Sequence, residues 1–254
     1  MRALAVFSRH FLRGKAAHPC AKKKAQGWGT GFLGVRTGSI AMFLWAVTAF
    51  AQPAVSAQPE VQLEYSNPGV SPAHWTLTVR PDGSGHFRSE RGAAKADGVR
   101  TLVIGDIDRE VQVSAKFAGE VFATAERHKG FHEECESHWK VAFTGTKTLR
   151  FSSPRESGSC SFNYSKDKEI EALGEEMVAV AETLVTGARL ELLLQHDRLG
   201  LDAELEALMH AVQDSRALQL GAIRGILQRL CEDPAVMERV RKRARVLLER
   251  TAAE

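Results

Sequence analysis

The chain has 254 residues and a formal net charge of +3 at neutral pH. Residues 1–57 hold eight Lys and Arg residues and no Asp or Glu, so removing them takes the formal charge from +3 to −5. Nucleic-acid binding depends on clustered Lys and Arg that displace counterions from the phosphates. The charge balance therefore argues against a nucleic-acid partner.

An uncharged apolar run occupies residues 40–51 and follows Arg36. Small residues alternate with larger ones at its end, and again just before Ala57. A basic flank, a short apolar core and a small-residue cleavage site are the layout of a secretory signal peptide. The core is shorter than the roughly 20 residues that span a bilayer. We expect residues 1–57 to be a leader cleaved near Ala51 or Ala57, leaving no stable membrane span and a periplasmic or secreted protein.

The segment before the apolar core is long and basic for a signal peptide. One hypothesis is that translation begins near Val35, which would leave a leader of ordinary length. The alternative is a basic cytoplasmic tail that contacts anionic lipid or nucleic acid. The sequence leaves both open.

The composition after the leader changes near residue 166. Gly, Ser, Thr and aromatic residues prevail before it, whereas Leu, Ala, Glu and Arg prevail after it. This change predicts an α+β domain over residues 58–166 and a helical region over residues 167–254.

Two hairpins are expected in residues 58–166, because alternating strand formers flank segments of turn chemistry. The strands are expected at residues 75–79, 86–89, 141–144, 148–152 and 160–164, with a short strand or linker at 100–104.

A helix is predicted between the hairpins, beginning at Glu110 or Ser114 and ending near Lys129. Its apolar residues recur every four positions, and Gly130 follows as a stop signal. They are Val113, Phe117, Val121 and Ala125. We therefore expect a small antiparallel sheet with one helix packed across it.

Helical spacing of apolar residues predicts four helices in the remaining chain. They are expected from Asp167 to about Leu199 with a kink or break at Gly187, from an N-cap at Asp202 to Val212, from Ser215 to about Leu230, and from Asp233-Pro234 onward.

Three cysteines follow the leader. Cys135 and Cys160 flank the second predicted hairpin, and an oxidising compartment would permit a disulfide between them. Cys231 is then expected to be a buried free thiol at the end of a helix.

A His- and Cys-rich segment lies just before that hairpin. Histidine and cysteine are residue types that bind zinc, and residues three or four positions apart lie on the same face of a helix. The segment contains His128, His132, Cys135 and His138. Gly130 interrupts such a helix, and a disulfide would remove the thiolate. The segment therefore gives only an alternative hypothesis, a metal-dependent hydrolase that uses the three histidines.

Other catalytic signatures are missing. The sequence has no Gly-x-Ser-x-Gly motif and no Walker motif, and its neighbouring acids lie on amphipathic segments where carboxylates are usually solvated. We predict no cofactor.

Two further features suggest surfaces that bind a membrane or a partner. The last helix is rich in arginine, which suggests an envelope-associated protein held on an anionic membrane. Tyr65, Phe131, Trp75 and Trp139 could line a binding face, although aromatic residues in strands are more often core.

Three segments resemble an uncharacterised group of exported bacterial proteins. They are Trp75-Thr-Leu-Thr-Val-Arg-Pro-Asp-Gly83, Val141-Ala-Phe-Thr-Gly-Thr-Lys-Thr-Leu149 and Gly158-Ser-Cys-Ser-Phe-Asn-Tyr-Ser165. The resemblance implies export and an α+β core followed by helices, and it implies no catalytic residue. The leading prediction is thus an exported, non-enzymatic binding module whose partner is a protein or an envelope component.

Overall fold

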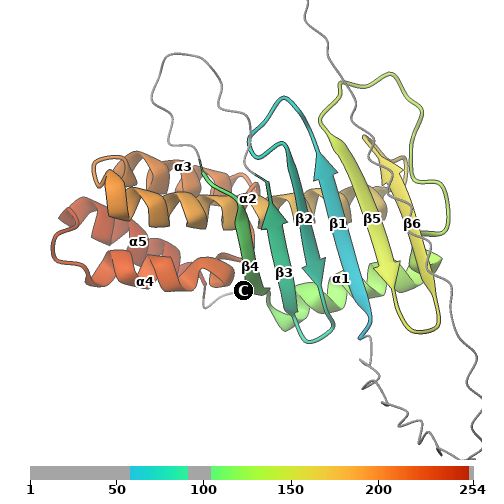
Figure 1. The fold of residues 1–254 in the computed structure, drawn as a ribbon, viewed down its shortest axis with the longest axis horizontal. Helices are drawn as coiled ribbons and strands as arrows, with labels where there is room; N and C mark the ends of the chain where they lie inside the picture. The colour runs from blue at the N-terminus through green and yellow to red at the C-terminus, as the bar shows by residue number, and fades with distance from the viewer. Residues whose placement is uncertain (1–57, 91–103, 252–254) are drawn as a thin grey trace, which may run out of the picture. The chain divides into compact units, whose positions relative to one another are not determined.

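The computed structural model describes residues 58–90 and 104–251. The predicted leader and residues 100–103 lie outside these ranges. The fold is α+β: a six-stranded antiparallel sheet with packed helices, followed by further helices (Figure 1). The elements are β1 (Glu60–Ser66), β2 (His74–Val79), β3 (Ser84–Ser89), β4 (Ile107–Gln112), α1 (Ala115–Arg127), the 3₁₀ turn η1 (Lys129–Phe131), β5 (Thr146–Ser152), β6 (Ser157–Phe162), α2 (Lys168–His196), α3 (Leu201–Gln213), the 3₁₀ turn η2 (Leu220–Ile223), α4 (Arg224–Glu232) and α5 (Glu238–Arg250).

The strand order is β4-β3-β2-β1-β5-β6, with β1 near the middle. Leu63 of β1 lies opposite Leu77 on one side and Leu149 on the other. All three side chains are fully buried, because alternate residues of each strand point to the same face of the sheet. That face forms the core.

Helices α1 and α2 cover the buried face, and Figure 1 shows both passing behind the strands. The predicted apolar face of α1 is confirmed: Phe117, Val121 and Ala125 are buried. Ser114, the second of the two predicted starts, is the N-cap, and its hydroxyl accepts a hydrogen bond from the Phe117 amide at 3.3 Å. Glu110 instead lies in β4, where exposed and buried residues alternate with the period of a strand.

Strand β1 was missed by the sequence prediction, and the predicted strand 141–144 is wrong. β5 pairs with β1 and β6, so β1 occupies the place that the prediction gave to residues 141–144. The hairpin of β5 and β6 contains the strand predicted at residues 148–152 and overlaps the one predicted at residues 160–164. Gly145 marks where the chain enters β5, with φ of 129° and the Tyr65 ring so close that a Cβ would overlap it.

Helix α2 is continuous through Gly187, so the predicted kink or break is absent. A Cβ at this position would overlap Ile223, so the glycine allows η2 to approach α2 closely. The C-terminal half of α2 contacts α3 and α4, while its N-terminal half lies against the sheet (Figure 1). One hydrophobic core therefore runs from the sheet into the helical part.

Three predicted helix starts are wrong. Helix α3 begins after Gly200, and Asp202 forms ion pairs instead of a cap. Ser215 has φ of 58°, which is incompatible with helix, so α4 starts later. Asp233 ends α4, and its side chain accepts a hydrogen bond from the Ala235 amide at 2.8 Å, which turns the chain before α5.

Candidate functional site

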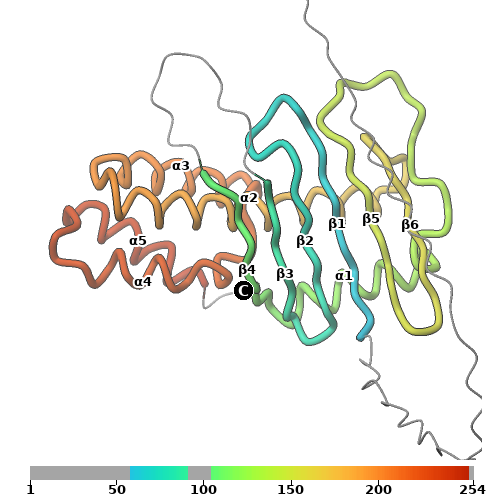
Figure 2. The backbone as a smooth tube through the Cα atoms, in the orientation of Figure 1, coloured from blue at the N-terminus to red at the C-terminus, as the bar shows by residue number. Residues whose placement is uncertain are grey.

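The predicted disulfide is confirmed between Cys135 and Cys160, whose Cα atoms lie 5.6 Å apart. Cys160 belongs to β6, and Cys135 belongs to residues 132–145, which we call the aromatic loop. Both cysteines are buried. The bond joins an irregular segment to a strand at the edge of the sheet, and Figure 2 shows the loop running outside β6 before it enters β5.

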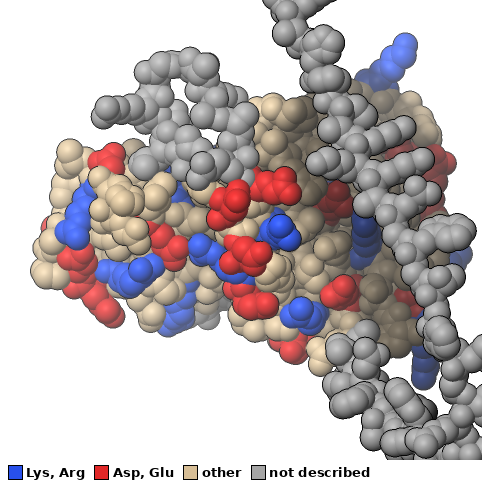
Figure 3. Space-filling model, viewed as in Figure 1, with Lys and Arg blue, Asp and Glu red and all other residues tan. Residues whose placement is uncertain are grey.

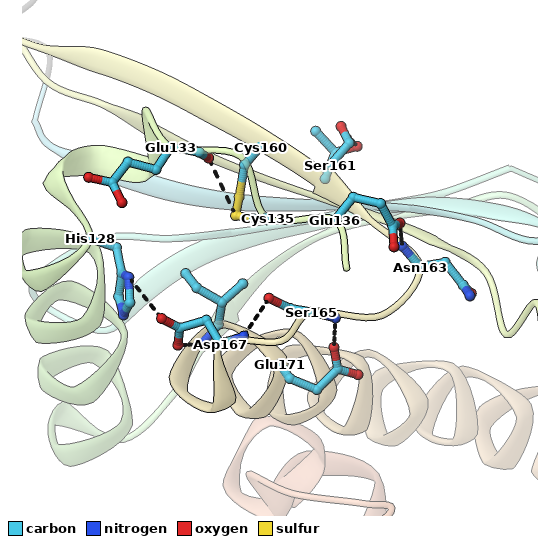
Figure 4. The surroundings of a disulfide bond; sticks show 12 residues. His128, Glu133, Cys135, Glu136, Cys160, Ser161, Asn163, Ser165, Asp167 and Glu171 are labelled. Carbon is cyan, nitrogen blue, oxygen red and sulfur yellow. Dashed lines mark hydrogen bonds and ion pairs between the residues drawn. A yellow bond between two sulfur atoms is a disulfide. The ribbon is translucent and has the colours of Figure 1, made fainter. Parts of the chain in front are cut away.

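Glu136 fixes the loop beside the disulfide (Figure 4). Its carboxylate accepts hydrogen bonds from the backbone amides of Asn163 at 2.7 Å, Ser137 at 2.8 Å and His138 at 3.3 Å. These bonds stabilise the charged form and hold the pKa of Glu136 below its ordinary value. The Ser137 amide also donates to the Tyr164 carbonyl at 2.9 Å. The loop is thereby bonded to the segment that follows β6.

Asn163 holds the far end of the loop. Its side-chain oxygen accepts a hydrogen bond from the Thr144 amide at 2.8 Å, and its nitrogen donates to the Ala142 carbonyl at 3.0 Å. The Tyr65 hydroxyl donates to the Thr144 carbonyl at 2.6 Å, and Asn67 donates to the same oxygen at 2.9 Å. Side chains thus replace the strand partner that residues 141–144 were predicted to have.

The loop, together with Tyr164 just after β6, exposes apolar side chains that we call the aromatic patch. The exposed fractions are 57% for Trp139, 43% for Val141, 60% for Phe143 and 36% for Tyr164. These are four of the seven large apolar residues exposed in the described part of the chain. Trp139 and Tyr164 stack with ring centroids 5.8 Å apart. Gathered apolar exposure of this kind marks interaction sites more often than scattered exposure does.

Two lysines flank the aromatic patch. Lys140 lies between Trp139 and Val141 and is exposed, and the Lys166 ammonium lies 5.7 Å from the Trp139 ring centroid. Neither lysine forms an ion pair with a carboxylate of residues 58–90 or 104–251. The nearby Glu134 is paired with His138 at 2.7 Å. Both signs of charge therefore lie near the aromatic patch: the two lysines have no carboxylate partner among the described residues, and the Glu136 carboxylate is held by backbone amides.

The predicted metal ligands are not brought together. His128 lies between Asp167 at 3.7 Å and Glu169 at 3.4 Å, whereas His132 lies 3.5 Å from Glu156. Figure 4 shows His128 directed at Asp167, at the start of α2. Within the described ranges, no group of three or more His, Cys, Asp or Glu side chains is placed to hold a metal ion. Cys135 is oxidised, so it offers no thiolate.

The arginines of α5 largely meet carboxylates. Arg239 and Arg243 both pair with Asp202, at 3.0 and 2.6 Å. Arg241 pairs with Glu238. Much of the charge that the sequence prediction assigned to a membrane surface thus joins α5 to α3 or is neutralised within α5.

The open face of the sheet is polar. The face of the sheet away from α1 carries cross-strand pairs such as His86 with Asp108 at 2.8 Å and Arg150 with Glu64 at 2.8 Å. Figure 3 shows charges of both signs interspersed on the side turned to the viewer.

A cavity of about 420 Å³ lies beside α2, lined by Glu175, Glu176 and Glu182 together with Val178, Ala179, Ser215, Arg216 and Leu218.

The other predicted aromatic candidates belong to the core. Trp75 is 5% exposed, Phe131 is 1% exposed, and Tyr65 is half-buried. Only Trp139 of the four predicted residues lies on an open surface. Val141 and Phe143 were missed, because their alternation was interpreted as a strand. Cys231, predicted to be buried, is half-buried, and desolvation raises the pKa of its thiol.

Comparison with known proteins gives no family for the chain: no family model and no curated protein matches it. None of the helices in the described ranges has the length and apolarity needed to cross a bilayer.

Proposed function

We propose that the chain is an exported, non-enzymatic binding module that recognises its partner through the aromatic patch. The observation that carries this proposal is the concentration of exposed apolar side chains on one anchored loop. Aromatic residues supply much of the binding energy of protein surfaces, and a surface held in place before binding loses less entropy.

Export is supported by two independent features. Disulfides persist mainly in oxidising compartments outside the cytoplasm, and the Cys135–Cys160 bond is buried in the fold. Residues 36–57 have the basic, apolar and small-residue pattern of a removable signal.

The proposal is tested by fractionating cells that produce the full chain. The double variant Trp139→Ser/Phe143→Ser removes the aromatic patch, and Leu199→Ser is the matched control because Leu199 is 79% exposed elsewhere. Envelope and soluble fractions are separated, and the soluble fraction is resolved by size. We expect wild type and control in a bound form, and the double variant as a free monomer of the same thermal stability. A wild-type chain that is free in every fraction, or a double variant distributed like wild type, would contradict the proposal.

A further inference from the structure

We propose that the partner of the aromatic patch is a bilayer surface rich in anionic phospholipid; this inference rests on the function proposed above. Tryptophan and tyrosine favour the boundary between lipid headgroups and hydrocarbon, because their rings are apolar and carry one polar group. Trp139 and Tyr164 stack side by side, and the more apolar Val141 and Phe143 follow Trp139 in the aromatic loop. The aromatic patch thus offers interfacial anchors beside residues that can insert further.

Two lysines beside the aromatic patch can pair with anionic headgroups. Lys140 and Lys166 flank the rings without a carboxylate partner among the described side chains. A lysine stem can lie along apolar surface while its ammonium reaches the phosphates. The chain beyond residue 57 is acidic overall, so this local charge, and not the net charge, would favour the membrane.

Several backbone groups of the aromatic loop are hydrogen-bonded within the protein. Unpaired peptide groups are costly to bury against lipid. Here the Ala142 carbonyl and both polar groups of the Thr144 backbone are bonded to side chains, as described above. The Trp139 amide donates to the Ser137 hydroxyl at 3.1 Å, and the Val141 amide donates to the Trp139 carbonyl at 2.9 Å. The loop can therefore approach the bilayer without breaking the bonds that shape it.

Because the loop is firmly attached to the fold, it could dock on a bilayer as a rigid element. The disulfide, Glu136 and Asn163 join it to β6 and to the segment after it. Helix α5, the other candidate for membrane contact, has most of its arginines in ion pairs. Val246 is the one large apolar side chain that α5 exposes, so the aromatic loop offers more apolar surface to a bilayer.

The test measures how much of the oxidised, purified chain sediments with lipid vesicles. One set contains phosphatidylglycerol and phosphatidylcholine, and the other contains phosphatidylcholine alone. All variants are compared in the same processed form, so that any contribution of residues 1–57 is constant. We expect binding to the anionic vesicles, and a loss of about tenfold for Trp139→Ser or Phe143→Ser, since each removes a half-exposed apolar side chain from the interface. Leu199→Ser should bind like wild type.

The lysines give an independent readout. Lys140→Gln and Lys166→Gln should each weaken binding to anionic vesicles about fivefold and leave binding to neutral vesicles unchanged. Added salt should act in the same direction. A chain that does not bind anionic vesicles, or whose binding is the same in all patch and lysine variants, overturns the inference.

Failure of this inference can be told apart from failure of the proposed function. If vesicles do not bind, but Trp139→Ser/Phe143→Ser still frees the chain in the cell fractions, the aromatic patch binds a protein and only the lipid inference is wrong. If neither assay responds to the aromatic patch, both are wrong.

Discussion

Removal of the Cys135–Cys160 disulfide should destabilise the protein by about 3.5 kcal/mol. The two cysteines are 25 residues apart in sequence. In the chain-entropy model, a crosslink over a loop of that length lowers the entropy of the unfolded chain by about 12 cal/mol/K, which gives this figure at 25 °C. Cys135→Ser/Cys160→Ser keeps both positions small and leaves neither a thiol nor a crosslink.

Urea unfolding followed by circular dichroism measures the effect. With a denaturant slope of about 2 kcal/mol/M, the midpoint should fall by about 1.7 M. Cys231→Ser is the control, since Cys231 makes no disulfide and should shift the midpoint little. The double variant should also be cleaved faster by chymotrypsin after Trp139 and Phe143, because the loop has lost its covalent anchor. A midpoint shift below about 0.5 M with unchanged cleavage would refute the anchoring role of the bond.

Three other substitutions test the packing and the electrostatics. Lys147→Ala should cost about 2–3 kcal/mol in urea unfolding, because it leaves Glu171 and Glu175 without the buried ammonium that joins β5 to α2; an unchanged midpoint would contradict this. Glu136→Gln should destabilise the protein at neutral pH, and the difference should vanish as the pH falls through the lowered pKa of Glu136, since protonation removes the same charge. Glu176→Gln should act in the opposite direction, because burial and Glu120 raise the pKa of Glu176. The stability of the wild type falls as the pH rises through this raised pKa. The variant should therefore be more stable than wild type at neutral pH and equally stable in acid. Parallel pH profiles of variant and wild type would contradict either electrostatic prediction.

Much of the fold follows from local signals in the sequence. The period-4 face of α1 and the turn chemistry before β3 each describe a short stretch of chain, and both are found as predicted. These features need no knowledge of distant partners. The disulfide was also found as predicted, although the hairpin over residues 141–152 that the prediction relied on does not form.

The sequence-based predictions fail where contacts between distant parts of the chain determine the local structure. Strand β1 was missed, although it pairs with β2 and β5, because its sequence carries several charged and polar residues on the open face. Residues 141–144 have the alternation of a strand, but no strand of the described ranges pairs with them, and the side chain of Asn163 takes the role of a pairing partner. The aromatic patch exists for that reason, and the sequence alone could not distinguish it from a buried strand.

The most direct test of the central claim places a photo-crosslinking amino acid at position 143 of the full chain in living cells, with position 199 as the matched control. Both side chains are exposed, and only the first lies in the aromatic patch. We expect light-dependent adducts from position 143 that disappear when Trp139→Ser is added, and none above background from position 199. Equal adducts from the two positions, or none from position 143, would contradict the assignment of the aromatic patch as the recognition surface.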